Sequence, residues 1–363
     1  MIVIGYIILA FTAIQLVVAV VNLFTVTHLP YTGIITDKKI SVLIPARNEE
    51  INLGNLLPDL YSQPYRNIEV IVFDDLSDDG TASIAESFSK KDARFRLIRS
   101  KGLPGGWLGK NHACHSLSLE ATGEYFLFLD ADVRVGGNLI GDAMSYSETS
   151  SCDLVSIFPM QLIKTWGEWI TVPAMNYILV TLLPLMLVRY SRFSSLAAAN
   201  GQFMFFKARA YRETFPHEMM KNNKVEDILI ARYFKKTRRK VSCLLGDERI
   251  SCRMYSSLAE SVNGFSKNVI EFFGGSILLA ILFWAVTTAG FLVILYNFGT
   301  AVFIVYLSAF FLTRIAVSLS GKQSIFKNLL CTLPMQLSMG LFIIRSIKSK
   351  LFGTYIWKGR NIS

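Results

Sequence analysis

Acidic residues are absent from the last quarter of this 363-residue chain: positions 272–363 contain no Asp or Glu but eight Lys or Arg. This segment therefore supplies eight of the ten units of net positive charge, because residues 1–271 balance 29 basic against 27 acidic side chains. A nucleic-acid-binding protein needs a basic face on a folded soluble domain, so we expect no nucleic-acid partner. Only 18% of the residues are charged and the mean hydropathy is +0.40, which favours basic residues flanking membrane segments.

Cysteine is scarce, and two phosphate-binding motifs are missing. The five cysteines are widely spaced and form no C-x-x-C pair, which indicates neither a disulfide framework nor a zinc ribbon and favours a reducing compartment. No G-x-G-x-x-G follows the first expected strand, and no G-x-x-x-x-G-K-[ST] occurs. A dinucleotide-binding fold and a P-loop NTPase would both lack their phosphate cradle.

Long apolar runs mark both ends of the chain. Residues 2–24 carry no charge and are long enough to cross a hydrocarbon core of about 30 Å. They lack the basic n-region and the small-residue cleavage site of a signal peptide, so we predict a retained transmembrane anchor over residues 1–27. The first charges after this anchor are Asp37, Lys38 and Lys39, and the positive-inside rule then places the following domain in the cytoplasm.

The second apolar block covers residues 274–345. Its runs 275–295 and 301–319 predict a transmembrane hairpin, within which Arg314 is either functional or snorkels to the interface. The run 329–344 is short and contains Pro334, and a crossing there would put the basic tail outside, so we expect a re-entrant or interfacial segment. Residues 346–363 would then be a basic cytoplasmic tail of a multi-pass protein in the plasma membrane.

Residues 38–273 alternate short β-rich runs with helical patterns. Buried strands are predicted at 40–45, 68–73, 95–99, 125–129 and 154–158, and helices at 52–61, 81–89, 110–120 and 139–147. This rhythm is typical of an α/β domain with an open, mostly parallel sheet. Ligands bind off the carboxyl ends of the strands in such sheets.

Polar clusters follow three of these strands, at 45–50, 74–81 and 130–132. Any one of these clusters by itself would be interpreted as a solvated loop, with Asp79 or Thr81 as a helix N-cap. Together they concentrate negative charge at one edge of the sheet, which favours a cation there. Asp130 and Asp132 directly follow a buried strand, and such hard oxygen ligands suit Mg²⁺ or Mn²⁺ with a bridging diphosphate.

In this order, Ile44-Pro45-Ala46-Arg47-Asn48-Glu49-Glu50, the run 74–81, Asp130-Ala131-Asp132 and Glu226-Asp227 resemble the inverting family 2 glycosyltransferases. Their domain has the GT-A nucleotide-sugar-binding fold, a Rossmann-like, mostly parallel sheet, and the resemblance covers residues 38 to about 271. The segments 106–114, 253–255 and 357–360 are most similar to two membrane-bound groups, the diaponeurosporenoate (carotenoid acid) glycosyltransferases and the hopanoid-associated glycosyltransferases. Both share this layout of an amino-terminal anchor and a carboxy-terminal hydrophobic block.

The resemblance implies a role for each matching residue. Asp130 and Asp132 would bind the metal, and Asp227 of the Glu226-Asp227 pair would be the catalytic base. The residues implied in binding the nucleotide sugar are Pro45, Ala46, Arg47, Glu49, Asp74, Asp75, Lys110, Asp130, Gly201, Gln202 and Arg253. The metal would neutralise the leaving diphosphate, and the base would take the acceptor proton.

Residues 166–188 form a further apolar stretch, interrupted by Glu168, Pro173 and Pro184. A membrane crossing here would separate Asp130 and Asp132 from Glu226-Asp227. We therefore expect this stretch to be an interfacial amphipathic segment of the cytoplasmic domain.

One departure from the family bears on the product. Polymer-forming members carry Q-x-x-R-W, whereas residues 250–254 read Ile-Ser-Cys-Arg-Met, so Arg253 is kept but the Gln and Trp are not. The sequence therefore predicts transfer of a single hexose, from a UDP-linked donor, to a lipid acceptor such as a carotenoid acid or another isoprenoid or hopanoid lipid. The alternatives are a polyprenyl-phosphate sugar synthase and, disfavoured by the presence of Asp130, Asp132 and Asp227, a non-catalytic sugar-nucleotide sensor or scaffold.

Overall fold

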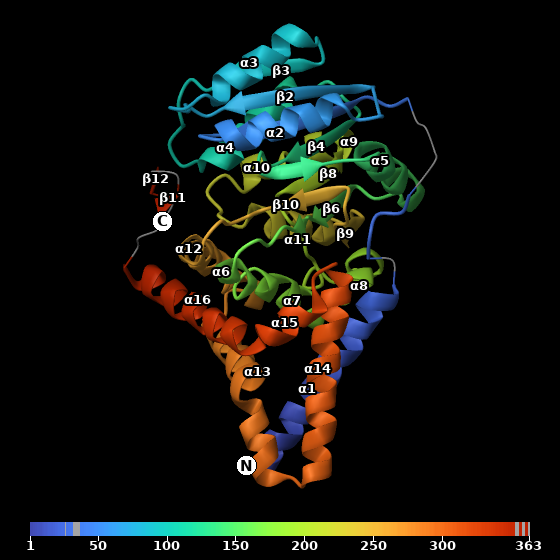
Figure 1. Ribbon diagram of the computed structural model, residues 1–363. Coiled ribbons are helices and arrows are strands. Elements are labelled where there is room, and N and C mark those ends of the chain that lie inside the picture. Colours follow the sequence, from blue (N-terminus) through green and yellow to red (C-terminus); the bar gives the residue numbers. More distant parts are fainter. Residues whose placement is uncertain (26, 32–36, 353–355, 358–359, 362–363) are drawn as a thin grey trace. The chain divides into compact units, whose positions relative to one another are not determined.

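The computed structural model describes residues 1–25, 27–31, 37–352, 356–357 and 360–361 (Figure 1). The chain groups into two compact units. The first, which we call the helical unit, consists of Met1–Thr25, Gln161–Pro184 and Arg253–Ser363. The second, which we call the sheet unit, consists of Val26–Met160 and Leu185–Cys252.

The sheet unit is built from alternating strands and helices. Its strands are β1 (Ile40–Ala46), β2 (Ile68–Asp74), β3 (Phe95–Arg99), β4 (Tyr125–Leu129), β5 (Val133–Val135), β6 (Leu154–Phe158), β8 (Phe203–Lys207), β9 (Val241–Leu245) and β10 (Ile250–Cys252), and β7 (Met160–Gln161) lies at its boundary. Its helices are α2 (Glu50–Tyr61), α3 (Thr81–Lys91), α4 (Gly109–Glu120), α5 (Leu139–Ser150), α8 (Leu185–Tyr190), α9 (Ala208–Arg212), α10 (Pro216–Met219) and α11 (Glu226–Lys236). The five predicted strands are confirmed to within one residue at each end.

Seven strands form the main sheet, in the order β3-β2-β1-β4-β8-β6-β9. The pairs β1–β2, β1–β4, β2–β3 and β6–β9 are parallel, whereas β8 runs antiparallel to β4 and β6. The predicted mostly parallel α/β sheet is confirmed, but the position of β8 was not foreseen. The strand order reverses between β1 and β4, and such a reversal opens a crevice at the carboxyl ends of the two strands.

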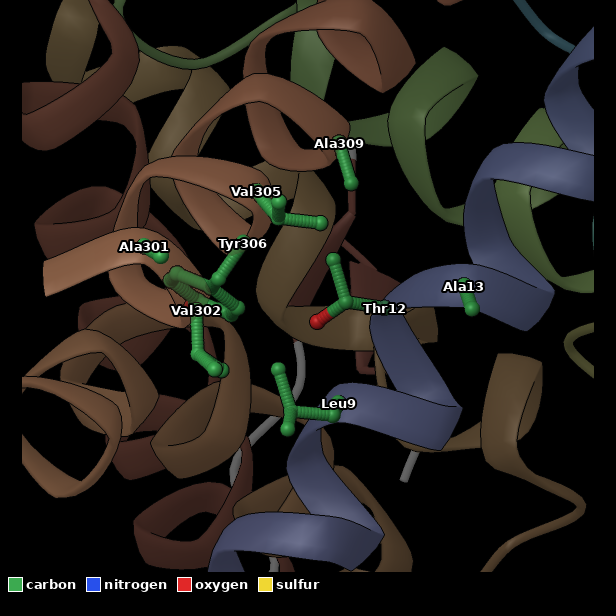
Figure 2. Close-up of a pocket in the computed structure, with 8 residues that line it drawn as sticks. All are labelled: Leu9, Thr12, Ala13, Ala301, Val302, Val305, Tyr306 and Ala309. Carbon is green, nitrogen blue, oxygen red and sulfur yellow. The ribbon is translucent and has the colours of Figure 1, made fainter. Parts of the chain in front are cut away.

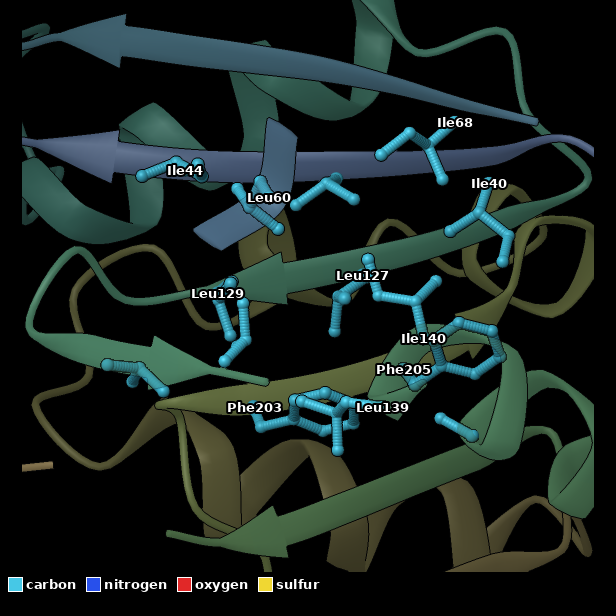
Figure 3. Packing of buried hydrophobic residues seen from close by; sticks show 14 of the residues in the cluster. Ile40, Ile44, Leu60, Ile68, Leu127, Leu129, Leu139, Ile140, Phe203 and Phe205 are labelled. Atoms are coloured by element: carbon cyan, nitrogen blue, oxygen red, sulfur yellow. The ribbon is translucent and has the colours of Figure 1, made fainter. Parts of the chain in front are cut away.

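Apolar side chains bury this sheet on both faces. Ile40 and Ile44 of β1 and Leu127 of β4 point to one side, where they pack with Phe203 and Phe205 of β8 (Figure 3). Phe126 and its alternate neighbours point to the other side and are buried as well, since successive residues of a strand face opposite ways. A sheet covered on both faces holds its strand ends rigidly, which is what a catalytic site requires.

The helical unit contains the long apolar helices. Its elements are α1 (Ile2–Phe24), α6 (Trp166–Trp169), α7 (Pro173–Leu182), α12 (Leu258–Asn268), η1 (Glu271–Phe273), α13 (Ile277–Asn297), α14 (Thr300–Ser320), α15 (Ile325–Leu330), α16 (Thr332–Phe352), β11 (Ile356–Trp357) and β12 (Arg360–Asn361). Among the described residues, α1, α13 and α14 are long and apolar enough to cross a membrane. The three predicted runs at 2–24, 275–295 and 301–319 are thus confirmed as helices.

Two segments differ in detail from the expectation. The run 329–344 lies mostly within the longer helix α16, where Pro334 occupies the first turn, a position at which a helix tolerates proline. The stretch 166–188 is divided, because α6 and α7 belong to the helical unit and α8 to the sheet unit. In the predicted basic tail 346–363, residues 353–355, 358–359 and 362–363 lie outside the described residues.

Candidate active site

The ends of β1 and β2 bring the first group of predicted site residues together. The parallel register pairs Ala46 with Asp74, and the residue after β2 continues this contact, since Asp75 N donates to Ala46 O at 2.8 Å. Pro45 is the neighbouring β1 residue, paired with Phe73. Asp74 is buried, and its Oδ1 accepts a hydrogen bond from Ser77 N at 3.2 Å.

Arg47 and Glu49 link the two loops that follow these strands. Arg47 Nη1 donates to the carbonyl oxygens of Asp75 at 2.6 Å and Leu76 at 3.2 Å. Glu49 N donates to Thr81 Oγ1 at 2.8 Å, and its Oε2 accepts from Asn52 Nδ2 at 2.7 Å. These predicted nucleotide-pocket residues therefore shape the edge of the sheet by holding one loop against the other.

Sequence reasoning missed Asn48, which lies between Arg47 and Glu49. Its φ of +52° is in the left-handed region, which asparagine tolerates better than most residues. Its Oδ1 accepts from Asp78 N at 2.9 Å, and its own N donates to Ser77 Oγ at 3.0 Å. The signal for this role was an asparagine two residues after the end of a strand.

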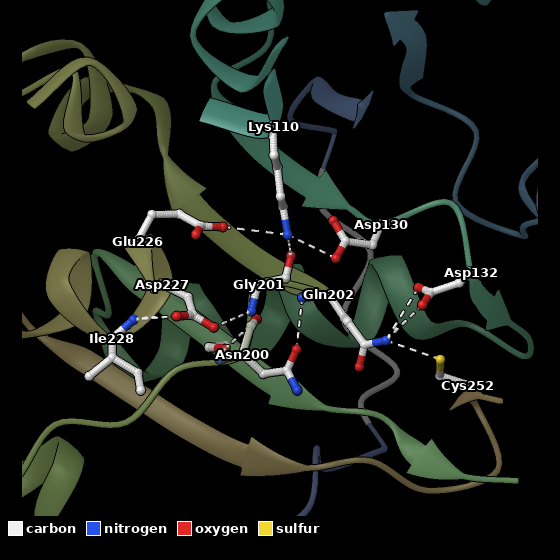
Figure 4. A network of polar contacts seen from close by, with 11 residues as sticks. Lys110, Asp130, Asp132, Asn200, Gly201, Gln202, Glu226, Asp227, Ile228 and Cys252 are labelled. Atoms are coloured by element: carbon white, nitrogen blue, oxygen red, sulfur yellow. Dashed lines mark hydrogen bonds and ion pairs between the residues drawn. The ribbon is translucent and has the colours of Figure 1, made fainter. Parts of the chain in front are cut away.

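Asp130 and Asp132 follow the end of β4, the strand that neighbours β1 in the sheet, and their contacts are drawn in Figure 4. Asp130 Oδ2 is 2.8 Å from Lys110 Nζ. Asp132 accepts hydrogen bonds from Gln202 Nε2, at 3.2 Å to Oδ1 and 3.3 Å to Oδ2. Burial, and then the negative charges of Asp130 and Glu49, raise the pKa of Asp132 to about 6.

Lys110 joins this pair to a second pair of carboxylates. It lies in the first turn of α4, and its Nζ is 3.5 Å from Glu226 Oε1 as well as 2.8 Å from Asp130 Oδ2. Burial by itself would lower the pKa of Lys110, but the two carboxylates outweigh it and hold that pKa well above the ordinary value. The lysine therefore stays charged and links two acidic groups from distant parts of the sequence.

Glu226 and Asp227 begin helix α11. Asp227 Oδ1 accepts from Ile228 N at 2.7 Å, and its Oδ2 accepts from Gly201 N at 2.9 Å. Burial raises the pKa of Asp227, although these backbone donors oppose it. Burial also raises the pKa of Glu226 to about 7, against the opposing effect of Lys110, so this carboxyl can take up or release a proton near neutral pH.

The segment before β8 packs into the middle of this network. A Cβ added at Gly201 would lie 2.8 Å from Lys110 Nζ, so only glycine fits without moving the lysine. Gln202 Nε2 also contacts Cys252 Sγ at 3.0 Å. Asn200, which the sequence did not single out, orients this turn, because its Oδ1 accepts from Gln202 N at 2.8 Å and its N donates to Ser156 Oγ at 2.7 Å.

Arg253 lies in the helical unit rather than the sheet unit. Its Nη2 is 2.7 Å from Oε1 of Glu168, whose side chain is fully buried. Burial opposes ionisation of Glu168, but the backbone donors Thr165 and Lys164 and the Arg253 guanidinium together lower its pKa. The structure thus shows Arg253 in an ion pair within the helical unit, and its role in binding the nucleotide sugar stays a prediction.

The donor set at β4 fits a divalent cation that also binds a diphosphate. Among the described residues, no group of three or more His, Cys, Asp or Glu side chains could hold a metal ion by itself. A cation of the Mg²⁺ type needs only one or two carboxylates when substrate phosphates complete its coordination. Burial, and after it the charges of Asp130 and Glu49, raise the pKa of Asp132, and a cation bound to these carboxylates would oppose that shift.

Residues 41–215 match the model of the family described as glycosyl transferase family 2. The chain is 28% identical over 265 residues to the 4,4'-diaponeurosporenoate glycosyltransferase of Staphylococcus haemolyticus (strain JCSC1435), an alignment covering 69% of this chain and 67% of that protein. It is 26% identical over 259 residues to the protein of the same name from Staphylococcus aureus (strain MRSA252), covering 68% and 66%. The match therefore spans about two thirds of the length of these relatives.

A solved structure matches over nearly the whole chain. The mannosyltransferase PcManGT from Pyrobaculum calidifontis, in complex with GDP-Man and Mn²⁺, has a TM-score of 0.55 and 16% identity, and the match covers 96% of this chain and 99% of that one. At this identity the likeness concerns the fold alone. It confirms the GT-A fold that the sequence motifs implied.

Proposed function

We propose that this chain, in which residues 41–215 form a glycosyl transferase family 2 domain, transfers one hexose from a UDP-linked sugar to a lipid acceptor in the membrane. The observation that carries this proposal is the convergence of Asp130 at the end of β4 and Glu226-Asp227 at the start of α11 around Lys110. Such a site can hold a diphosphate at one end and a base at the other. The names of the relatives support a carotenoid acid as the acceptor.

In the proposed reaction, Asp132 and Asp130 would hold Mg²⁺ or Mn²⁺, whose positive charge would offset the negative charge of the leaving diphosphate. Gln202 orients Asp132 through its amide, and Lys110 adds a positive charge beside Asp130. Asp227 is held in place by the N–H of Gly201 and would take the proton if the acceptor is a hydroxyl. Attack from the side opposite the leaving group gives inversion at the sugar carbon.

Pro45, Ala46, Arg47, Glu49, Asp74 and Asp75 form the proposed nucleotide pocket. The ordered loops after β1 and β2 support this proposal, since they hold backbone groups at the crevice where such folds bind nucleotides. The three apolar helices support a multi-pass protein of the plasma membrane, with the sheet unit on the cytoplasmic side.

The test is mass spectrometry of lipid extracts from cells with and without the gene. We expect one lipid class to appear with an added hexose only when the gene is present. Hexose on a polyprenyl phosphate instead would identify an activated-sugar synthase, and the absence of any glycolipid difference would contradict the proposal.

Asp227→Asn distinguishes the acceptor class. A hydroxyl needs a base, which is worth roughly 10²- to 10⁴-fold, whereas a carboxylic acid with an ordinary pKa near 4 is already ionised at neutral pH. For a carotenoid acid we expect the variant to lose well under about 100-fold in kcat/KM. A loss near 10⁴-fold that does not change with pH, in a folded variant, would favour a hydroxyl acceptor instead.

A further inference from the structure

Arg314 is a buried cation in the middle of the helical unit. It lies in α14 and is 3% exposed. Its guanidinium carbon is 3.9 Å from the ring centre of Tyr177 and 5.3 Å from that of Phe310, and Nη1 is 3.7 Å from Met335 Sδ. Its Nε and Nη2 have no hydrogen-bond partner among the described residues. A snorkelling arginine reaches polar surroundings, and this one is enclosed by side chains instead.

The helical unit offers no spare negative charge to this guanidinium. Within the described part of this unit the acidic side chains are Glu168, Glu260 and Glu271. Glu168 pairs with Arg253, Glu260 accepts hydrogen bonds from the backbone and hydroxyl of Ser256, and Glu271 lies 3.4 Å from Lys350 Nζ. A buried ion without a charged partner is strongly unfavourable, so a bound anion would stabilise this guanidinium beyond its contacts with the Tyr177 and Phe310 rings.

An apolar groove lies on the same helix. It has a volume of about 440 Å³, and Leu9, Thr12 and Ala13 of α1 face Val305, Tyr306 and Ala309 of α14 across it (Figure 2). Tyr306, Phe310 and Arg314 are spaced four residues apart, so they share one face of α14. The rings of Tyr306 and Phe310 stack at 6.4 Å, and Phe310 contacts the guanidinium. This face thus runs from an apolar groove to an unpaired cation.

We propose that this face of α14 binds an anionic membrane phospholipid, whose phosphate pairs with Arg314 and whose acyl chain occupies the groove between α1 and α14. The planar guanidinium has two donors without a hydrogen-bond partner, Nε and Nη2, a geometry suited to phosphate oxygens once the side chains that enclose it move aside. Basic pockets between membrane helices recognise lipid headgroups in this way. The inference rests on the proposed membrane location of α1, α13 and α14 but not on the glycosyl transfer reaction.

The test measures which lipid stays on the purified full-length protein. The protein is held in detergent micelles that contain equimolar phosphatidylglycerol and phosphatidylcholine, and native mass spectrometry counts the adducts. We expect the wild type to retain about tenfold more of the anionic lipid, which corresponds to about 1.4 kcal/mol. Arg314→Met should reduce this preference to within about twofold. Arg345→Gln, which removes an exposed arginine from α16, is the matched control and should keep the preference.

Ala309→Phe places a bulky ring in the groove and leaves Arg314 unchanged. It provides a second test of the proposal in case Arg314→Met does not fold. This variant should also lose the bound phosphatidylglycerol. Equal retention of both lipids by the wild type, or an unchanged preference in folded Arg314→Met, would overturn the proposal. So would displacement of the lipid by millimolar inorganic phosphate or by oleate at equal concentration, because the site would then prefer a free anion or a fatty acid. Flotation of the protein with vesicles checks the membrane location separately.

Discussion

Lys110 balances the charges of the candidate site. Its ammonium lies between Asp130 of the β4 end and Glu226 of α11, and both carboxylates would otherwise face each other's charge in a buried region. Removing one member of such a network exposes the others to an uncompensated charge. Single substitutions here should therefore have effects that depend on charge, size and pH. Variants of Asp132, Gly201 and Glu226 test these three dependences one at a time.

Asp132→Asn tests metal binding. The amide has the shape of the carboxylate but no charge, so we expect transfer to fall by about 100-fold or more while the fold is kept. Excess EDTA should abolish wild-type activity, and added Mg²⁺ or Mn²⁺ should restore it. Glu124→Gln, an exposed residue directly before β4, is the matched control and should leave activity unchanged. Full activity in EDTA would end the metal hypothesis.

Gly201→Ala tests the close approach of the backbone to Lys110. The new Cβ would lie 2.8 Å from Lys110 Nζ and must push the ammonium away from its place between the carboxylates. Since misplacement by an ångström can be costly, we expect kcat/KM to fall by about tenfold or more. The control is Gly105→Ala, where a Cβ would meet nothing within 4 Å. If both variants are equally active, Lys110 does not need this position.

Glu226→Gln tests the buried carboxyl through stability. Burial raises the pKa of Glu226 to about 7, above an ordinary value of about 4.3 in the unfolded chain. Between these two values the unfolded state loses the proton first, so rising pH destabilises the fold, and the effect is complete above pH 7. The variant cannot ionise and should gain up to about 3 kcal/mol relative to wild type between pH 4.5 and pH 7.5.

Thermal midpoints of wild type and Glu226→Gln in detergent, measured across this pH range, provide the check. The difference between the two proteins should grow with pH and then level off. A difference that stays constant from pH 4.5 to pH 7.5 would mean that Glu226 has the same pKa in the folded and unfolded states.

At the scale of elements, α1 does more than anchor the chain. A stripe of small and polar residues on α1 is buried within the helical unit: Gly5, Thr12, Gln15, Ala19 and Asn22. Asn22 Nδ2 donates to the carbonyl oxygens of Val180 and Leu183, each at 2.9 Å, which caps the end of α7. Gln15 Nε2 donates to Thr181 Oγ1 at 3.3 Å. This spacing of polar residues packs α1 against the segment that contains α7.

Asn22→Leu should therefore destabilise the helical unit. The variant removes two hydrogen bonds and leaves two carbonyls at the end of α7 without this donor, at a cost of about 1–2 kcal/mol. The thermal midpoint in detergent should fall, whereas Val17→Leu, at a position of α1 that is 60% exposed, should leave it unchanged. An unaltered midpoint in Asn22→Leu would show that the polar stripe does not hold α1 in place.

At the scale of the whole molecule, the main prediction concerns which side of the membrane each segment lies on. If the segment 166–188 lies on the cytoplasmic face, its two ends must be reached from the same side of the membrane. Lys164→Cys and Arg192→Cys introduce exposed thiols near these ends, and all five native cysteines are buried. A membrane-impermeant maleimide should label both only in inside-out vesicles. Tyr296→Cys, at a 93% exposed position in the last turn of α13, should be labelled in intact cells.

Labels that reach positions 164 and 192 from opposite sides would contradict the interfacial placement. Such a result would mean that the segment crosses the membrane, which would place the carboxylates of β4 and those of α11 on opposite sides. Labelling of position 296 from the cytoplasmic side would contradict the predicted transmembrane hairpin. The placement of 166–188 would still be decided by the labelling of positions 164 and 192.

The local pattern was sufficient for five strands of the main sheet and for the long apolar helices. Runs of apolar residues bounded by polar turns located β1, β2, β3, β4 and β6, and uninterrupted apolarity located α1, α13 and α14. The pattern did not show that β8 enters the sheet antiparallel between β4 and β6. Strand order depends on which surfaces pack together over long sequence separations, and a local run carries no information about that partner.

The amino-acid sequence alone determined the α/β class, the apolar helices, the acidic strand ends and the family resemblance, because each depends on residue type and short-range spacing. Only the tertiary structure decided which charges meet. Lys110 and Glu226 are 116 positions apart in the chain yet form one ion pair, and Arg314 lacks a carboxylate because the few acids of its unit are engaged elsewhere. Coulomb interaction depends on distance and burial in the folded chain, and sequence spacing specifies neither.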